Sequence, residues 1–160
     1  FLEFLDAHDV KFISSERIVY SRKHQYIGQM DFEAMIDGKM SVGDFKTSNG
    51  LYNTVLAQMA AYQMAAEEEA EFLGTNVKYE NRYAVRLAKE TEDEYKVRIG
   101  KKNDIKQRQG KAVKDIPPYI PFEWIVSEGR ENFERDFNQG FLSTKNLLLW
   151  DAETDFYKNK

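Results

Sequence analysis

The pattern of hydrophobic and polar positions in the first third of the chain predicts short strands joined by tight turns. Segments 16–23, 26–36 and 39–46 each mix apolar with polar residues, which is typical of half-buried strands. Asp37-Gly38 separates the last two segments and favours a hairpin turn, whose central residues both need positive φ. We therefore expect these three strands to form an antiparallel meander, and residues 1–9 before them to be the end of a helix.

A long helix is predicted after the third strand. Leu51, Val55, Met59 and Tyr62 recur at helical spacing, and Gly74 is a typical residue to end the helix. The rest of the chain predicts strands at 80–88 and 94–99 around a turn at Glu90–Asp93, a connection without clear periodicity over 100–114, and a last helix over 122–149 that Gly140 interrupts.

Composition restricts the class of protein. With 160 residues, of which 42% are apolar and 14% aromatic, the chain can bury one core, so we expect a single domain over residues 1–160 and no global disorder. No apolar run reaches the roughly 20 residues that span a bilayer, so no membrane partner is expected. The chain has no cysteine, which excludes disulfides and thiolate metal sites and fits a cytoplasmic protein. Because the sequence starts at Phe1, we expect an N-terminal helical part to be missing.

Charge is unevenly distributed along the chain. The net charge is −4, yet the run from Lys96 to Lys114 is strongly basic, and the acidic run Glu67–Glu71 is expected at the exposed end of a helix. The basic run is either a solvated loop or a track for nucleic-acid phosphates, and its candidate contacts are Lys101, Lys102, Lys106 and Arg108. Aromatic residues that either stack on bases or belong to the core are Tyr79, Tyr83, Tyr119, Phe122 and Trp124.

Candidate chemistry gathers at the predicted hairpin. Asp44 and Lys46 are two residues apart and share one face of their strand. Alone, such a pair is more often a surface ion pair. A turn centred on Asp37-Gly38, however, places Asp44 opposite Asp31, and two directly opposed carboxylates repel each other. A cation between them would relieve the repulsion, and two carboxylates with water and a phosphate oxygen are typical of a Mg²⁺ site.

Two residues of the predicted long helix join this candidate site. Gln58 and Tyr62 stand at i and i+4 on one helix face, where they would pack over the sheet. Gln58 alternatively bonds only to backbone.

At this point the sequence resembles the PD-(D/E)XK nuclease superfamily, in its RecB-like exonuclease branch of phage or bacterial type. The resemblance covers about the first 70 residues and consists of five motifs in order. These are Glu16 on a strand, Gly28-Gln29-Met30-Asp31, Gly38-Lys39, Asp44-Phe45-Lys46-Thr47, and Gln58 with Tyr62.

The resemblance implies an α/β (α+β) fold with a restriction-endonuclease-like core, in which helices flank a central mixed sheet that contains the meander. It implies hydrolysis of phosphodiester bonds with Mg²⁺ or Mn²⁺, most often by an exonuclease on DNA ends or single strands in repair, recombination or phage replication. Asp31, Asp44 and the carbonyl of Phe45 would bind the metal, and Lys46 would orient or help to deprotonate the attacking water. Expected partners are DNA and replication or recombination proteins, in the host cytoplasm if the protein is phage-encoded.

Some positions depart from the family pattern or stay open. Met30 stands where proline is common, and an iron–sulfur cluster, which some relatives hold through cysteines, is excluded here. His8 is close to the element that carries a metal-binding histidine in many relatives, and His24 lies in a predicted turn. Glu16 either binds metal or braces the sheet. The alternative function is a nuclease-fold module that binds DNA without cutting it.

Overall fold

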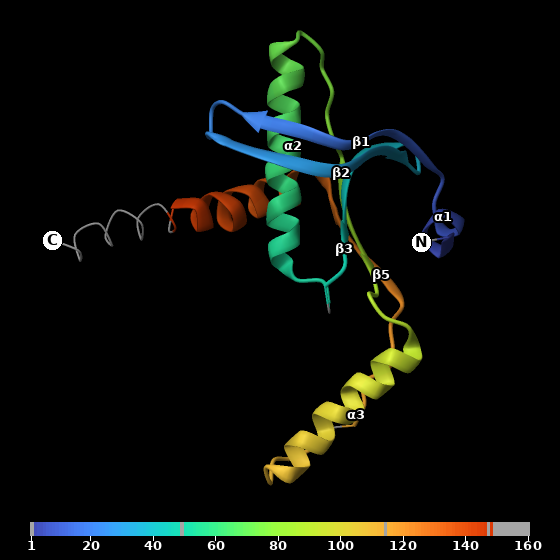
Figure 1. Ribbon diagram of the computed structural model, residues 1–160. Coiled ribbons are helices and arrows are strands. Elements are labelled where there is room, and N and C mark those ends of the chain that lie inside the picture. Colours follow the sequence, from blue (N-terminus) through green and yellow to red (C-terminus); the bar gives the residue numbers. More distant parts are fainter. Residues whose placement is uncertain (1, 49, 114, 147, 149–160) are drawn as a thin grey trace, which may run out of the picture.

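A computed structural model describes residues 2–48, 50–113, 115–146 and 148. One five-stranded sheet has the spatial order β1-β2-β3-β4-β5, with helices on both of its faces (Figure 1). The elements are α1 (Leu2–Ala7), β1 (Val10–Ser21), β2 (Tyr26–Ile36), β3 (Lys39–Lys46), α2 (Asn53–Phe72), β4 (Asn81–Leu87), α3 (Glu92–Arg108), β5 (Phe122–Glu128), α4 (Gly129–Arg135) and the π-helical stretch η1 (Asp136–Leu142). In the part of the chain that is described, no helix is both long and apolar enough to cross a membrane.

The predicted meander and mixed sheet are confirmed. β1, β2 and β3 pair antiparallel, β4 joins β3 in parallel, and β5 returns antiparallel to β4. Asp37 and Gly38 have φ of 52° and 77°, as the predicted hairpin turn requires. The bounds of β2 and β3 are those expected from the sequence, whereas β1 begins earlier than predicted, at Val10.

The side-chain alternation of β1 and β2 is interrupted where the two strands pass Glu16 and Asp31. Glu16 has a φ of 51°, in the left-handed region that non-glycine residues rarely adopt. In a regular strand Met30 and Phe32 would share a face. Instead, Met30 packs with the cluster on the α2 face, and Phe32 packs with the cluster on the opposite face. The strands therefore bend at Asp31, a residue of the candidate site.

The core consists of layers on both sides of the sheet. α2 is rich in alanine, a strong helix former, and lies across one face of the sheet. Ala60 and Ala61 of α2 are buried against Phe133 and Phe137, so α4 and η1 form a further layer behind α2. On the opposite face, α1 contributes the fully buried Phe4.

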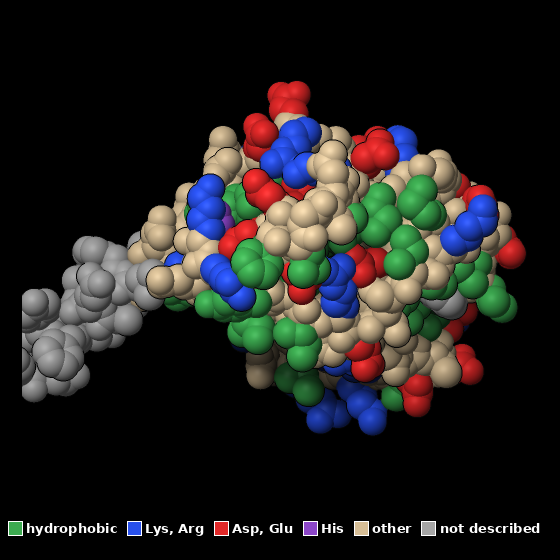
Figure 2. Space-filling view, turned by 90° about the horizontal axis from the view of Figure 1, so that it is seen from above, with side chains coloured by type: hydrophobic (Ala, Val, Ile, Leu, Met, Phe, Trp, Pro, Cys, Tyr) green, Lys and Arg blue, Asp and Glu red, His purple; other side chains and the backbone are tan. Residues whose placement is uncertain are grey.

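The acidic run of α2 is not simply exposed, as the sequence predicted. Glu67 is buried and accepts hydrogen bonds from Gln63 and Arg130, the second at 2.6 Å. Glu69 forms an ion pair with Arg17 of β1. The prediction was wrong because acidic residues at the end of α2 neutralise arginines of neighbouring elements. Figure 2 shows this end of the molecule with acidic and basic side chains interspersed.

Glu68 ties α2 to the turn between β1 and β2. Its carboxylate accepts hydrogen bonds from Ser21 Oγ at 2.6 Å and from the backbone N–H groups of Arg22 and Lys23 at 2.9 and 3.0 Å. Burial by itself would raise the pKa of Glu68, but these hydrogen bonds outweigh it and lower the pKa below the usual 4.5. The ionised carboxylate therefore stabilises the folded chain.

Glu68→Gln is expected to lower the free energy of unfolding at pH 7 by about 1 kcal/mol, because a partly exposed charged hydrogen-bond acceptor becomes neutral. A lowered pKa contributes stability above the unfolded-state value and loses it as the pH falls through the folded-state value. The unfolding free energies of both proteins in urea should thus converge as the pH falls through the lowered pKa of Glu68. Glu71→Gln, at an exposed position of the same helix, is the control and should change little. A difference that persists unchanged at pH 3 would contradict this role of the charge.

The predicted strand at 94–99 is wrong, because this segment lies in α3. Thr91 caps the helix in a capping box with Glu94, and the first turn carries three acidic residues, which favour a helix N-terminus. The predicted turn at Glu90–Asp93 is therefore the helix start, and most of the predicted connection 100–114 continues the helix. No residue of α3 is buried. A helix that packs against no core needs no apolar stripe, and its sequence therefore lacks the periodic pattern by which a helix is usually predicted. Lys114 lies outside the described residues.

The predicted helix over 122–149 is only partly correct. Phe122–Glu128 forms β5, which pairs antiparallel with β4. Phe122 lies opposite Leu87 at one end of this pairing, and Glu128 lies opposite Asn81 at the other. Helical structure starts at Gly129, and the interruption expected at Gly140 is the π-helical stretch η1. A Cβ atom on Gly140 would lie 2.8 Å from Ala57 Cβ, so glycine allows the close approach of η1 to α2. Residue 149 lies outside the described residues.

Candidate active site

The centre of the site is an ion pair at the carboxyl end of β3. Asp44 and Lys46 share the α2 face of the strand, and Lys46 Nζ lies 2.5 Å from Asp44 Oδ2. The Asp44 side chain is only 6% exposed, and that of Lys46 is 23% exposed. The pair is thus not the solvated surface ion pair that such a spacing usually produces.

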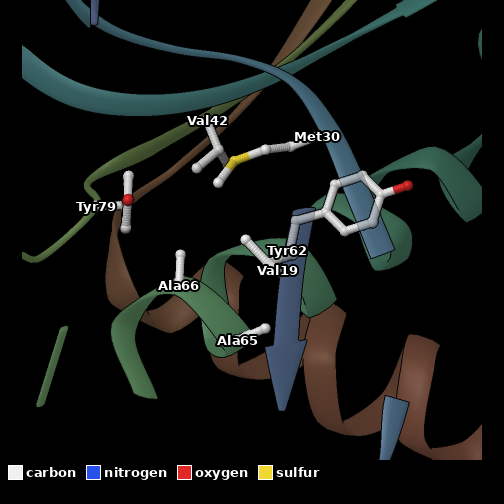
Figure 3. Close-up of a cluster of buried hydrophobic side chains, with 7 residues drawn as sticks. All are labelled: Val19, Met30, Val42, Tyr62, Ala65, Ala66 and Tyr79. Atoms are coloured by element: carbon white, nitrogen blue, oxygen red, sulfur yellow. The ribbon is translucent and has the colours of Figure 1, made fainter. Parts of the chain in front are cut away.

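α2 supplies the next two groups. Lys46 Nζ donates to Gln58 Oε1 at 2.7 Å, and Gln58 Nε2 donates to the Tyr62 hydroxyl at 2.8 Å. Gln58 therefore bonds to side chains of the site. The Tyr62 ring packs in the cluster with Val19 and Met30, while its hydroxyl points out of that cluster (Figure 3).

Gly28 allows this close packing of α2 on β2. A Cβ atom at Gly28 would overlap the Tyr62 ring, so a larger residue would force the ring from its place. The glycine of the Gly28–Asp31 motif and the tyrosine of the helix motif thus belong to one contact.

Asp31 lies on β2 beside the ion pair. The observed pairing Phe32–Gly43 is the register that a turn at Asp37-Gly38 requires, and it makes Asp44 the next neighbour of Asp31. Asp31 Oδ2 accepts a hydrogen bond from the Phe45 backbone N–H at 2.6 Å. This bond links the carboxylate of β2 to the backbone of β3 between Asp44 and Lys46.

The electrostatics of the site follow from burial and from two nearby acids. Burial is the largest influence on the Asp44 carboxyl and raises its pKa, Lys46 opposes the rise, and Asp31 adds to it. For Tyr62, burial followed by the charges of Asp44 and Asp31 raises the pKa to about 12. Both carboxylates therefore act on the same small region in front of α2.

The donor set suits a divalent ion held by few protein ligands. Mg²⁺ in phosphate-handling sites is commonly bound by one or two carboxylates with water and substrate oxygens. Asp31 and Asp44 are such carboxylates, and the buried Asp44 Oδ2 has no well-oriented hydrogen bond despite the proximity of Lys46. Among the described residues no three His, Asp or Glu side chains come close enough together to hold a metal ion. A metal would thus depend on Asp31, Asp44 and non-carboxylate oxygens such as the Phe45 carbonyl.

Some sequence candidates do not join this centre. Glu16 is exposed at the bend of β1, and its backbone carbonyl accepts a bond from Gln29 Nε2 at 3.4 Å. His8 lies 2.6 Å from Asp37 Oδ2 at the hairpin, with its ring against Tyr83 on the face of the sheet opposite α2. The centroids of the His24 and Phe137 rings are 5.0 Å apart. Burial lowers the pKa of His24.

The four basic candidates, Lys101, Lys102, Lys106 and Arg108, are exposed on α3. Because β3 and β4 are parallel, their carboxyl ends lie at one edge of the sheet, and α3 follows β4 there. Figure 1 shows α3 projecting from this end of the sheet. The basic helix is therefore on the side of the molecule where β3 presents Lys46.

Arg86 is a site residue that the sequence analysis missed. It pairs with Lys46 in the register of β3 and β4, and it is buried. Its Nη2 donates to the Ile120 carbonyl at 2.7 Å, and its Nε binds Glu123 of β5. Only the parallel pairing with β4 brings Arg86 next to Lys46, so no local sequence signal indicated it.

Comparison of the chain with known protein families and with curated protein sequences finds no match.

Proposed function

We propose that the chain is a metal-dependent DNA nuclease with a restriction-endonuclease-like core, acting as an exonuclease on DNA ends or single strands. The observation that carries this proposal is the pair of buried Asp44 and half-buried Lys46 at the carboxyl end of β3, with Asp31 next to it on β2. Burying an ion pair costs desolvation energy, so the placement of Asp44 away from solvent calls for a reason other than stability.

Each residue has a distinct part in the proposed reaction. Asp31 and Asp44 would hold Mg²⁺ or Mn²⁺, together with the Phe45 carbonyl. When bound, such an ion polarises the phosphate and activates water. Lys46, held between Asp44 and Gln58, would orient the water and neutralise charge on the phosphoryl oxygens. Tyr62 keeps Gln58, and through it the Lys46 ammonium, in place.

One observation favours the alternative, a module that binds DNA without cutting it. Both acids have protein partners, because Asp31 accepts from the Phe45 N–H and Asp44 pairs with Lys46. The two functions separate in a digestion assay with end-labelled single-stranded DNA. Cleavage with Mg²⁺ or Mn²⁺, abolished by a chelator, supports the nuclease. DNA binding without cleavage under either metal supports the alternative.

The geometry of α3 suggests which basic residues face the DNA. Residues three or four apart lie on one side of a helix. Tyr95, Ile99, Lys102 and Lys106 therefore form one stripe, and its first two residues line a pocket beside Thr47 at the end of β3. The stripe leads from the site outward along α3.

Lys102→Ala/Lys106→Ala is expected to weaken DNA binding and to reduce its salt dependence. Removal of one phosphate-binding cation lowers the slope of log K against log salt by about 0.7 for a single strand, so the double variant should lower it by about 1.4. Lys101→Ala/Arg108→Ala removes the same charge from another side of the helix and should change the slope less. Fluorescence anisotropy from low to high salt measures both. Equal changes in the two variants would contradict a defined stripe.

A further inference from the structure

A pocket of about 330 Å³ lies directly beyond the candidate site. Thr47 and Ser48, which follow Lys46, form one side of the pocket, and Arg86, the neighbour of Lys46 on β4, forms another. Helix α3 contributes Tyr95 to the wall of the pocket. The segment between α3 and β5 contributes Tyr119. Its volume falls at the lower end of the range of about 300–1,000 Å³ that is usual for small-molecule sites.

Two aromatic rings stand in the wall of this pocket. The Tyr95 and Tyr119 ring centroids are 5.6 Å apart, and the rings are inclined by 50°. The Tyr95 hydroxyl donates to the Pro117 carbonyl at 3.0 Å, and the Tyr119 hydroxyl donates to the Glu90 carbonyl at 2.5 Å. Because both hydroxyls are bound to backbone, the rings are held in position before any ligand enters.

Cations surround the rings. Arg86, Lys89 and Arg98 line the pocket, against the acids Glu90 and Glu123. Arg98 is paired with Glu90 and Arg86 with Glu123, so the acids hold the guanidinium groups in place and leave one cation in excess. Arg86, whose side chain is 7% exposed, uses Nε and Nη2 in its contacts with Glu123 and the Ile120 carbonyl. A guanidinium carries five N–H donors, so these two contacts use only part of its hydrogen-bonding capacity.

We propose that this pocket binds one nucleotide of single-stranded DNA, the nucleotide next to the phosphate held at Lys46. The base stacks on Tyr119, whose ring packs against Tyr95, and its phosphate is met by Arg86. Stacking on an aromatic ring accepts any base, because every base has a π-face, and this suits a nuclease without sequence preference. The assignment rests on the proposed nuclease function, since it places the pocket beside a scissile phosphate.

The test is the binding of two oligomers to the Asp44→Asn protein, in which we expect cleavage to be blocked. One is oligo-dT of about ten nucleotides, within the usual range for single-strand sites, and the other is a strand of equal length without bases. Tyr119→Leu, added to this protein, keeps an apolar side chain but removes the ring. Tyr119→Phe keeps the ring and is the matched control, and Tyr20→Leu removes an exposed tyrosine from β1, outside the pocket.

We expect Tyr119→Leu to weaken binding of oligo-dT about 5- to 100-fold and to leave binding of the base-free strand unchanged. Tyr20→Leu should bind both strands as the Asp44→Asn parent does, and Tyr119→Phe, which keeps the ring but loses the bond to the Glu90 carbonyl, should bind oligo-dT more tightly than Tyr119→Leu. If Tyr119→Leu binds oligo-dT normally, or if it weakens both strands equally, the pocket does not hold a base. Tyr95→Leu, on the other ring, repeats the test if Tyr119→Leu fails to fold.

Failure of the pocket and failure of the proposed function give different results. Digestion of the same oligo-dT by the unchanged protein with Mg²⁺ tests the function, whereas the two-strand comparison tests the pocket. If binding of oligo-dT depends on the Tyr119 ring but no cleavage occurs, the proposed pocket is supported and the proposed nuclease function is refuted. If cleavage occurs but binding of oligo-dT does not depend on the Tyr119 ring, the proposed nuclease function is supported and the proposed pocket is refuted.

Discussion

Asp44→Asn is expected to lower metal-dependent cleavage of single-stranded DNA by at least about 10³-fold. The substitution preserves the shape of the side chain but removes the charge that would bind the metal, and a metal contributes several kcal/mol to transition-state stabilisation, at a factor of ten for each 1.36 kcal/mol. Asp31→Asn should have a similar effect on cleavage. The measurement is single-turnover cleavage of end-labelled DNA at saturating Mg²⁺.

The fold of the Asp44→Asn protein should remain intact. Burial raises the pKa of Asp44, so the ionised carboxylate destabilises the folded chain at neutral pH, and the neutral amide removes this cost. A thermal melt without metal is therefore expected at the same or a higher temperature than that of the parent protein. Asp9→Asn, at an exposed acid near the hairpin, is the control and should cleave normally. Near-normal cleavage by either site variant would show that Asp31 and Asp44 are not the metal ligands.

Lys46→Ala should slow cleavage by at least about 10²-fold, the scale set by removal of one electrostatic or acid–base group. Metal binding should be nearly unchanged, because the ammonium contacts Asp44 and Gln58 but supplies no ligand. Single-turnover cleavage across pH measures the first effect, and Mn²⁺ titration followed by electron paramagnetic resonance measures the second.

Lys46→Arg distinguishes two roles of the lysine. A guanidinium keeps its positive charge and does not accept a proton from water, and its planar shape does not fit the space between Asp44 Oδ2 and Gln58 Oε1 in the same way. We expect little rescue. Full activity of the arginine variant would mean that Lys46 provides only charge, and its part in activating water would have to be abandoned.

Much of the candidate site was accessible from local patterns. The two-residue spacing of Asp44 and Lys46 and the four-residue spacing of Gln58 and Tyr62 each define a shared face, because strands and helices have fixed periods. The turn at Asp37-Gly38 determines the register that sets Asp44 beside Asp31. The interruption at Asp31, by contrast, lies opposite a non-glycine residue with positive φ, Glu16, which no local pattern indicates.

The second half of the chain was harder to predict. The exposed α3 has no apolar stripe, so its capping box at Thr91 was the only strong signal for a helix. Phe122, Trp124 and Val126 alternate as in a strand, but an edge strand needs a partner, and β4 provides it from a distant part of the sequence. Sequence patterns report which neighbours a residue has along the chain, and these elements depend on neighbours across the sheet.

The sequence by itself determined the meander, the long helix and the group Asp31, Asp44, Lys46, Gln58 and Tyr62, because turns, strand periods and helix periods act over a few residues. Only the tertiary structure decided what surrounds that group. The parallel pairing of β3 with β4 sets Arg86 beside Lys46. The return of the chain after α3 brings Tyr119 against Tyr95. The packing of α4 on α2 pairs the buried Glu67 with Arg130, whose side chain is half exposed. Each of these contacts joins residues far apart in the sequence, and their free energy comes from burial and charge pairing that exist only after the sheet has assembled.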